Sequence, residues 1–156
     1  MAAQIPSRAT SKYAGQYGGA FDSQRIVDIF VDSYKIAMSS KIPQTASDRF
    51  ALAVAAYHQL MSMGLTTDVQ ESVNRSMETL VGSFPIQVVA NEALGLRDKA
   101  LRLKTPRKRL DLLLRAREIL NRGLTEHPSS LVLQESVAEL RTVISQAEVP
   151  DTLPVR

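Results

Sequence analysis

The sequence predicts an all-α fold of about six antiparallel helices, arranged as a bundle or a short helical-repeat array, with an extended N-terminal arm and a short C-terminal tail. Apolar residues recur at helical spacing along most of the chain, and no segment alternates apolar and polar residues for long enough to indicate a strand. The length of 156 residues, with 44% hydrophobic and 22% charged side chains, is typical of one folded domain. We therefore expect an arm at residues 1–21, a single helical domain at 22–148 and a tail at 149–156.

The first two helices are predicted by signals at their ends. Asp22 is a favourable N-cap for a first helix, which should stop before Pro43 because the residue ahead of a proline disfavours the helical conformation. Thr45 and Asp48 have the spacing of a capping box, in which two side chains satisfy free amides at a helix start. They predict a second helix that ends near Gly64.

The middle of the chain contains a second set of start and stop signals. Thr67 and Gln70 repeat the capping-box spacing and begin a third helix, which should stop at Gly82. Ser83 and Pro85 should open a fourth helix, because proline is favoured in the first helical turn, where its missing amide does no harm. The sequence thus predicts a break between residues 82 and 85.

The last two helices are predicted by the same kinds of signal. Thr105 and Pro106 form an N-cap and first-turn pair for a fifth helix, which should end within residues 123–128. Ser129 or Ser130 caps the sixth helix. The connections between successive helices are short, so we expect neighbouring helices to pack antiparallel.

Residues 116–138 carry a local pattern of small and apolar side chains. Ala116, Leu120 and Pro128 fall where a tetratricopeptide repeat places the conserved residues of its second helix. Val137 and Ala138 are similar to the small-residue pair of the helix that follows. The stretch therefore resembles part of a tetratricopeptide repeat. The resemblance implies a helical hairpin of the kind used in binding scaffolds, and no particular ligand.

The positive charge of the chain is concentrated in one segment. The formal net charge is +3, but residues 97–122 alone hold a large excess of basic over acidic side chains. The basic residues of this segment are Arg97, Lys99, Arg102, Lys104, Arg107, Lys108, Arg109, Arg115, Arg117 and Arg122, and the acidic ones are Asp98, Asp111 and Glu118. The segment crosses the end of the fourth predicted helix, a turn and the start of the fifth.

A basic triplet stands at the predicted start of the fifth helix. Arg107, Lys108 and Arg109 follow the N-cap, where the helix dipole favours acidic residues by about 0.3 to 1 kcal/mol each. An anion would compensate the triplet, because free amides at a helix start also bind phosphate and carboxylate groups. We therefore expect an anion- or nucleic-acid-binding surface at Arg102, Lys104, Arg107, Lys108 and Arg109. The alternative is a solvated face that Glu135 and Glu139 of the sixth predicted helix neutralise.

Nucleic acid could bind this segment only through the phosphate backbone. The aromatic side chains that would stack on bases lie far away in the sequence, at Tyr34, Phe50, Tyr57 and Phe84. Spaced cations are sufficient for contact with phosphates, and they give an affinity that falls as salt rises.

Residues suited to catalysis or metal binding are scarce. The chain has no cysteine and two histidines, His58 and His127, and neither histidine has a partner at a spacing typical of a metal site or a catalytic pair. We expect His58 in the core or an interface and His127 at a helix end. The serines stand at caps and turns, and the glycines do not form a phosphate-binding loop. We therefore expect no catalytic residue, no cofactor and no metal.

The location of the protein is constrained by its apolar and basic segments. The longest uncharged apolar run covers residues 51–57, which is too short to cross a bilayer, so we expect no membrane contact. The absence of cysteine favours an intracellular location, in the cytoplasm or within an assembled particle. Residues 1–21 carry Arg8 and Lys12 and no acid, so import into an organelle stays open.

The N-terminal arm is a second candidate binding element. Tyr13, Tyr17 and Phe21 are spaced aromatic residues that could dock into pockets on a neighbouring subunit. Together with the helical hairpins and the lack of an active site, they indicate a non-enzymatic structural or adaptor subunit of a larger homo- or hetero-oligomeric assembly. The alternative is a nucleic-acid- or phosphate-binding subunit that uses residues 97–122, such as a virion or ribonucleoprotein component.

Overall fold

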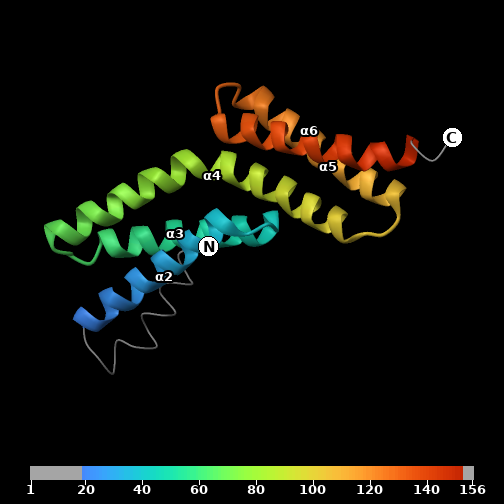
Figure 1. Ribbon diagram of the computed structural model, residues 1–156. Coiled ribbons are helices and arrows are strands. Elements are labelled where there is room, and N and C mark those ends of the chain that lie inside the picture. The colour runs from blue at the N-terminus through green and yellow to red at the C-terminus, as the bar shows by residue number, and fades with distance from the viewer. Residues whose placement is uncertain (1–18, 153–156) are drawn as a thin grey trace. The chain divides into compact units, whose positions relative to one another are not determined.

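The computed structural model describes the backbone of residues 19–152 and the side chains of residues 23–147. Within these residues the fold is all-α, as predicted, with five helices and no strand (Figure 1). The helices are α2 (Gly19–Ser39), α3 (Pro43–Met61), α4 (Thr67–Arg102), α5 (Pro106–Glu126) and α6 (Leu131–Thr152). Tyr13 and Tyr17 lie outside the described residues, and Phe21 lies in the first turn of α2 with its side chain outside them.

Several boundaries differ from those predicted. α2 begins at Gly19, ahead of the predicted N-cap Asp22 and inside the predicted arm. α3 begins at Pro43, so Thr45 lies within the first turn of the helix and does not cap it. α6 continues past residue 149, where the tail was expected to begin.

The break predicted between residues 82 and 85 is wrong, because one helix, α4, runs through both positions. Pro85 lies inside α4, where a proline removes one backbone hydrogen bond and costs about 3 kcal/mol. Packing of the adjacent residue offsets this cost, since Phe84 is buried and its ring stacks on that of Phe50 in α3 with the ring centroids 4.4 Å apart. Gly82 does not have a positive φ, so it continues the helix and does not end it.

Three other helix ends match their sequence signals. Gly64 has a φ of 65° just beyond α3, the left-handed conformation that glycine adopts most easily. Thr105 is the N-cap of α5, and Pro106 follows it as the first helical residue. Ser130 caps α6, since its Oγ accepts a hydrogen bond from the Leu133 amide at 3.2 Å.

The described residues group into two compact units, each with a core of its own. Unit 1 comprises residues 19–39 and 44–84, and unit 2 comprises residues 40–43 and 85–152. The first half of α4 therefore belongs to unit 1 and the second half to unit 2.

Unit 1 is built from α2, α3 and the first half of α4. Its core contains the buried side chains of Ile26, Phe30, Ala37, Ala46, Ala53, Ala55, Ala56, Leu60, Val73, Leu80 and Phe84. A hydrogen bond from Tyr57 Oη to Asn74 Oδ1, 2.6 Å long, joins α3 to α4 beside this core.

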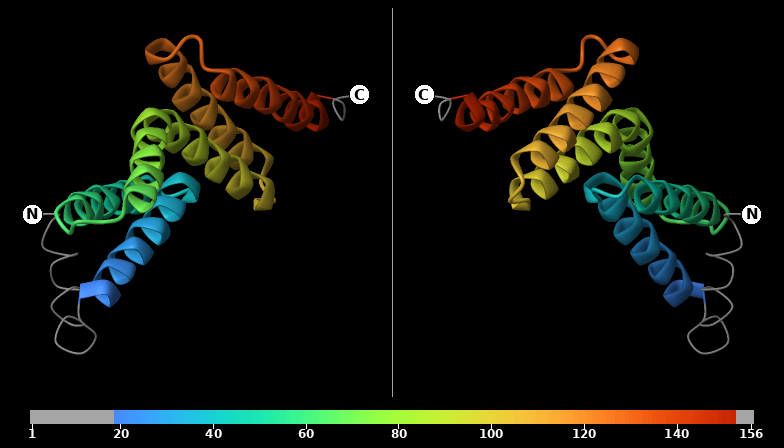
Figure 2. Two further views of the ribbon diagram at one scale, coloured as in Figure 1. Left: turned by 90° about the vertical axis from the view of Figure 1, so that its left-hand side faces the viewer. Right: turned by 90° about the vertical axis from the view of Figure 1, so that its right-hand side faces the viewer.

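Unit 2 is built from the second half of α4 together with the hairpin of α5 and α6 (Figure 2). Its core contains Ala90, Ala93, Ala100, Leu113, Ala116, Leu120, Leu133, Leu140 and Ile144. The three helices approach closely at Gly123, where an added Cβ would lie 2.9 Å from Val89 Cγ1 and 3.2 Å from Leu133 Cδ1. The resemblance noted for residues 116–138 implied a helical hairpin, and α5 and α6 do pack against each other. The likeness to a tetratricopeptide repeat itself stays an expectation.

Among residues 19–152, none of the helices combines the length and the apolar character that crossing a bilayer requires.

Candidate anion-binding surface

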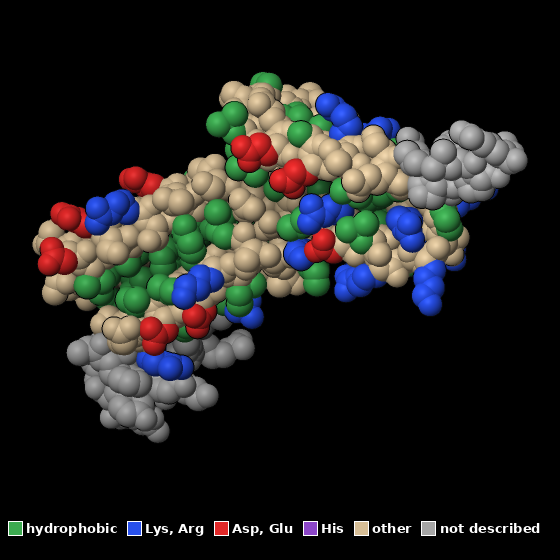
Figure 3. Space-filling view, viewed as in Figure 1, with side chains coloured by type: hydrophobic (Ala, Val, Ile, Leu, Met, Phe, Trp, Pro, Cys, Tyr) green, Lys and Arg blue, Asp and Glu red, His purple; other side chains and the backbone are tan. Residues whose placement is uncertain are grey.

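Five exposed cations lie where α4 ends and α5 begins. We call them the basic surface: Lys99, Arg102, Lys104, Arg107 and Lys108. The first two belong to the last turn of α4, the third to the connecting loop, and the last two to the first turn of α5. Figure 3 shows Lys and Arg side chains gathered over this part of unit 2.

The basic surface has no acidic partner among the described side chains. The ion pairs there join Asp98 to Lys41 and Arg97, and Arg97 to Glu139, and none of them includes a cation of the basic surface. Among the described residues, the five cations are therefore exposed and have no acidic side chain within ion-pair distance.

The start of α5 places backbone donors beside these cations. Thr105 has the extended backbone of an N-cap, with φ −81° and ψ 115°, but its side chain makes no capping hydrogen bond. The first backbone bond of α5 runs from the Arg109 amide to the Thr105 carbonyl oxygen at 3.0 Å. The amides of Arg107 and Lys108 precede this bond and have no acceptor in the helical ladder. An anion at this end would therefore meet amide donors and the helix dipole as well as the cations.

Arg109, the remaining predicted anion-binding residue, has a structural partner. Its Nε and Nη2 donate hydrogen bonds to the Leu103 carbonyl oxygen at 3.2 and 2.7 Å, and its side chain is half-buried. The guanidinium thus holds the connecting loop against α5. Arg102 donates from Nε to the Asp98 carbonyl oxygen at 3.3 Å but stays exposed. Arg102, Lys104, Arg107 and Lys108 are thus all exposed at this end of α5, next to Lys99, which the sequence placed in the basic segment but not in the predicted anion-binding set.

The rest of the exposed face of α5 alternates in charge. Oppositely charged side chains follow one another at intervals of three or four residues: Lys108, Asp111, Arg115, Glu118, Arg122 and Glu126. At this spacing the side chains are neighbours on a helix surface and offset each other's charge. Four cations of the basic surface, Lys99, Arg102, Lys104 and Arg107, lie outside this alternation, and so does the exposed Arg117. Most of the excess positive charge in residues 97–122 is therefore at the basic surface.

The acids of α6 that were expected to neutralise this segment do not pair with the basic surface. Glu139 Oε2 lies 3.6 Å from Nη1 of Arg97, on the second half of α4. Glu135 is exposed and forms no ion pair with any described side chain. No described acid of α6 thus forms an ion pair with the five cations.

Asp98 is held by two other cations of unit 2. Lys41 Nζ lies 2.6 Å from Asp98 Oδ2, and Arg97 Nη2 lies 3.4 Å from Oδ1. The hydrogen bond from Lys41, with the charges of both cations, outweighs desolvation and lowers the pKa of Asp98 below its ordinary value. Sequence reasoning missed this contact, because Lys41 and Asp98 are far apart in the chain and no local pattern links them.

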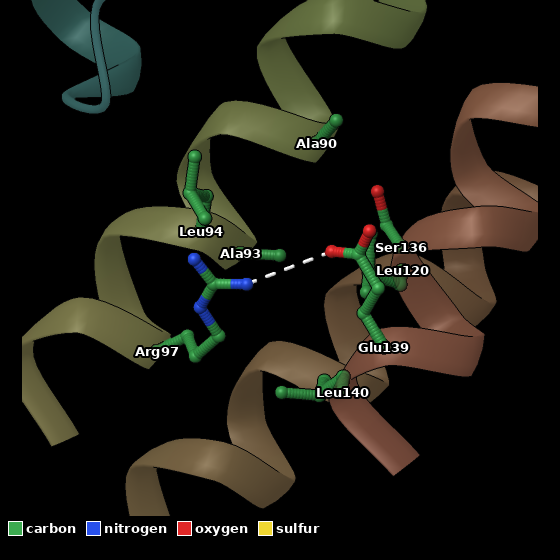
Figure 4. A pocket seen from close by; sticks show the side chains of 8 residues that line it. All are labelled: Ala90, Ala93, Leu94, Arg97, Leu120, Ser136, Glu139 and Leu140. Carbon is green, nitrogen blue, oxygen red and sulfur yellow. Dashed lines mark ion pairs between the residues drawn. The ribbon is translucent and has the colours of Figure 1, made fainter. Parts of the chain in front are cut away.

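A small cavity lies among α4, α5 and α6 beside the pair formed by Arg97 and Glu139 (Figure 4). Apart from that pair and Ser136, its lining is aliphatic, and its volume is about 30 Å³. A space of this size can hold a water molecule, whereas organic ligands occupy sites of about 300 Å³ or more. The cavity is therefore not a candidate active site.

No group of three or more His, Asp or Glu side chains able to hold a metal ion occurs in the described part of the chain. His58 is exposed on α3, with its ring centroid 5.6 Å from that of Tyr57, so it is not a core histidine. His127 is the C-cap of α5, and its amide donates to the Gly123 carbonyl oxygen at 2.8 Å, as expected for a helix end.

No protein-family model, curated protein or solved structure matches this chain. The properties of the basic surface therefore carry the functional conclusion.

Proposed function

We propose that this protein is a non-enzymatic subunit of a larger assembly and that it binds the phosphate backbone of a nucleic acid through its basic surface. The observation that carries the proposal is the exposure of five cations without an acidic partner among the described side chains. Contacts with phosphates supply the sequence-independent part of nucleic-acid affinity, and they need cations at several points along one surface.

A phosphate backbone suits this surface better than an acidic protein does. Aromatic side chains are frequent anchors at the centre of a stable protein interface, and the basic surface contains none. The free amides at the start of α5 add donors that favour phosphate. Because the basic surface has no aromatic side chain to stack on bases, we expect contact with the phosphate backbone of the nucleic acid and little sequence preference.

The test is a salt titration of binding to labelled single-stranded and double-stranded oligonucleotides. The variant carries Lys104→Ala, Arg107→Ala and Lys108→Ala, and it keeps Arg109 because that residue holds the loop. We expect the affinity to fall by about tenfold or more and the slope of log affinity against log salt to shrink by about 2 to 3, since three phosphate contacts are lost.

The matched control removes three exposed cations elsewhere, with Lys35→Ala, Arg75→Ala and Arg141→Ala. It changes the net charge equally and should leave the slope unchanged. Equal losses in both variants would mean that net charge, and not the basic surface, governs binding. A wild-type protein that binds polyglutamate but no oligonucleotide would point instead to an acidic protein partner.

A further inference from the structure

We propose that Thr105 is a phosphorylation site for a proline-directed serine/threonine kinase and that its modification switches off the basic surface. The effect on binding rests on the proposed function, whereas the modification itself does not.

The Thr105 hydroxyl is exposed and unused. Its side chain makes no capping hydrogen bond to α5, whereas Ser130, the N-cap of α6, accepts one from the Leu133 amide. Three other threonine hydroxyls bond to backbone carbonyl oxygens one turn earlier, as Thr79 does to Arg75 at 3.1 Å. Transfer of a phosphoryl group to Thr105 would therefore break no hydrogen bond of the described fold.

The backbone around Thr105 has the form that a kinase requires. A kinase must bring the hydroxyl into line with the γ-phosphorus of ATP, and an exposed residue with an extended backbone allows this approach. Thr105 is extended, and Pro106 keeps it so by disfavouring the helical conformation in the residue before it. Of the seven prolines in the chain, Pro106 is the only one that follows a serine or threonine. A proline-directed kinase therefore has a single target in this sequence.

In the transfer, ATP supplies the phosphoryl group and the kinase accepts the proton of the hydroxyl. Thr105 Oγ forms a bond to the γ-phosphorus of Mg²⁺-bound ATP as the bond from that phosphorus to the β,γ-bridging oxygen breaks. The hydroxyl proton passes to the catalytic aspartate of the kinase, and ADP leaves.

The product would compete with an external phosphate for the same donors. A phosphothreonine carries a charge of about −2, and here it would stand between Lys104 and the first turn of α5. The free amides of Arg107 and Lys108 are within reach of an N-cap side chain and would accept the new group as a cap. Part of the basic surface would thus be neutralised while α5 gained a stronger start.

The test treats the full-length protein with a proline-directed kinase and Mg²⁺-ATP and maps the product by mass spectrometry. The comparison uses two variants: Thr105→Val, which lacks the hydroxyl, and Pro106→Ala, which keeps the hydroxyl but loses the recognition element. We expect one phosphoryl group on Thr105 in the wild type and none in either variant. Far-UV circular dichroism of both variants checks that they are folded.

The modified wild-type protein is then compared with the unmodified protein. We expect oligonucleotide affinity to fall by about tenfold at physiological salt and the melting temperature to rise by about 2 °C. An unlabelled wild type, or labelling that persists in Thr105→Val, would overturn the modification site. Labelling that leaves affinity unchanged would overturn the switch. If the unmodified protein binds no oligonucleotide, the proposed function fails, while the labelling and melting results still decide the modification.

Discussion

Asp98 holds Lys41 and Arg97 as an ionised carboxylate, at 2.6 and 3.4 Å. Its pKa in the folded protein is lowered by these partners. A carboxylate with a lowered folded-state pKa stabilises the fold fully at a pH above its unfolded pKa, which is about 3.9 for aspartate. The contribution is lost as the pH falls through the folded-state value.

The change Asp98→Asn should therefore destabilise the protein in a pH-dependent way. At pH 7 the free energy of unfolding should fall by less than about 1 kcal/mol, because the pair is partly exposed and screened by solvent. The difference should be smaller at pH 3, where the carboxyl is being protonated, and it should vanish below the folded-state pKa. Urea denaturation of the wild type and the variant at pH 7 and at pH 3 measures this difference in the free energy of unfolding.

A matched control for this change is Asp32→Asn. Asp32 is exposed on α2 and forms no ion pair among the described side chains, so its replacement should matter little at either pH. A loss in Asp98→Asn that is as large at pH 3 as at pH 7 would contradict an ionised Asp98 as the source of the effect.

At the basic surface, the roles of some residues were predictable from the sequence and those of others were not. The cluster of cations next to a Thr-Pro helix start was visible in the sequence, because both signals are local. The role of Arg109 was not visible, since the Leu103 carbonyl oxygen that it binds becomes a partner only when the loop folds back on α5. The pairing of Lys41 with Asp98 joins two residues that are far apart in the sequence, and the local sequence around neither residue predicts it.

Two glycines inside helices have opposite surroundings. Gly123 is buried where the helices of unit 2 meet, and an added Cβ would lie 2.9 Å from Val89 Cγ1. Alanine favours a helix over glycine by about 1 kcal/mol, but overpacking a close contact costs about 1 to 3 kcal/mol. Gly123→Ala should therefore lower the free energy of unfolding by about 1 kcal/mol, as measured by urea denaturation.

The same change at Gly82 is the control. Gly82 is exposed within α4, and an added Cβ there would meet nothing within 4 Å. Gly82→Ala should raise the free energy of unfolding by about 0.5 to 1 kcal/mol, because only the helix propensity changes. If both changes stabilise the protein, the close packing at Gly123 is not limiting.

Helix ends were predictable where the signal is chemical and local. Gly64 supplies a left-handed turn, Thr105 is set by the proline that follows, and Ser130 bonds to an amide within its own turn. The failure at Pro85 has a physical reason, because the stacking of Phe84 on Phe50 favours a continuous helix and involves another part of the chain. The sequence pattern around Pro85 alone could not predict the contact between Phe84 and Phe50.

Assembly through the N-terminal arm remains a prediction at the level of the whole molecule. Replacing Tyr13, Tyr17 and Phe21 with alanine should weaken association in the native complex by about tenfold or more, because aromatic anchors supply most of the energy of such contacts. Sedimentation velocity of the complex measures the change. Replacing Ser7, Thr10 and Ser11 with alanine is the control and should leave association intact. Unchanged sedimentation of the aromatic variant would exclude the arm as the assembly element.

α4 belongs to the cores of both units, and Pro85 lies where its two halves meet. A proline has no amide proton, so the Val81 carbonyl oxygen receives no bond from that position. A helix unwinds by losing successive backbone hydrogen bonds from an opened end. Where one of these hydrogen bonds is already missing, unwinding can stop at little extra cost in free energy. The native-state fluctuations of the two units can therefore be separate opening events, with hydrogen-exchange protection of the α4 amides changing at Pro85.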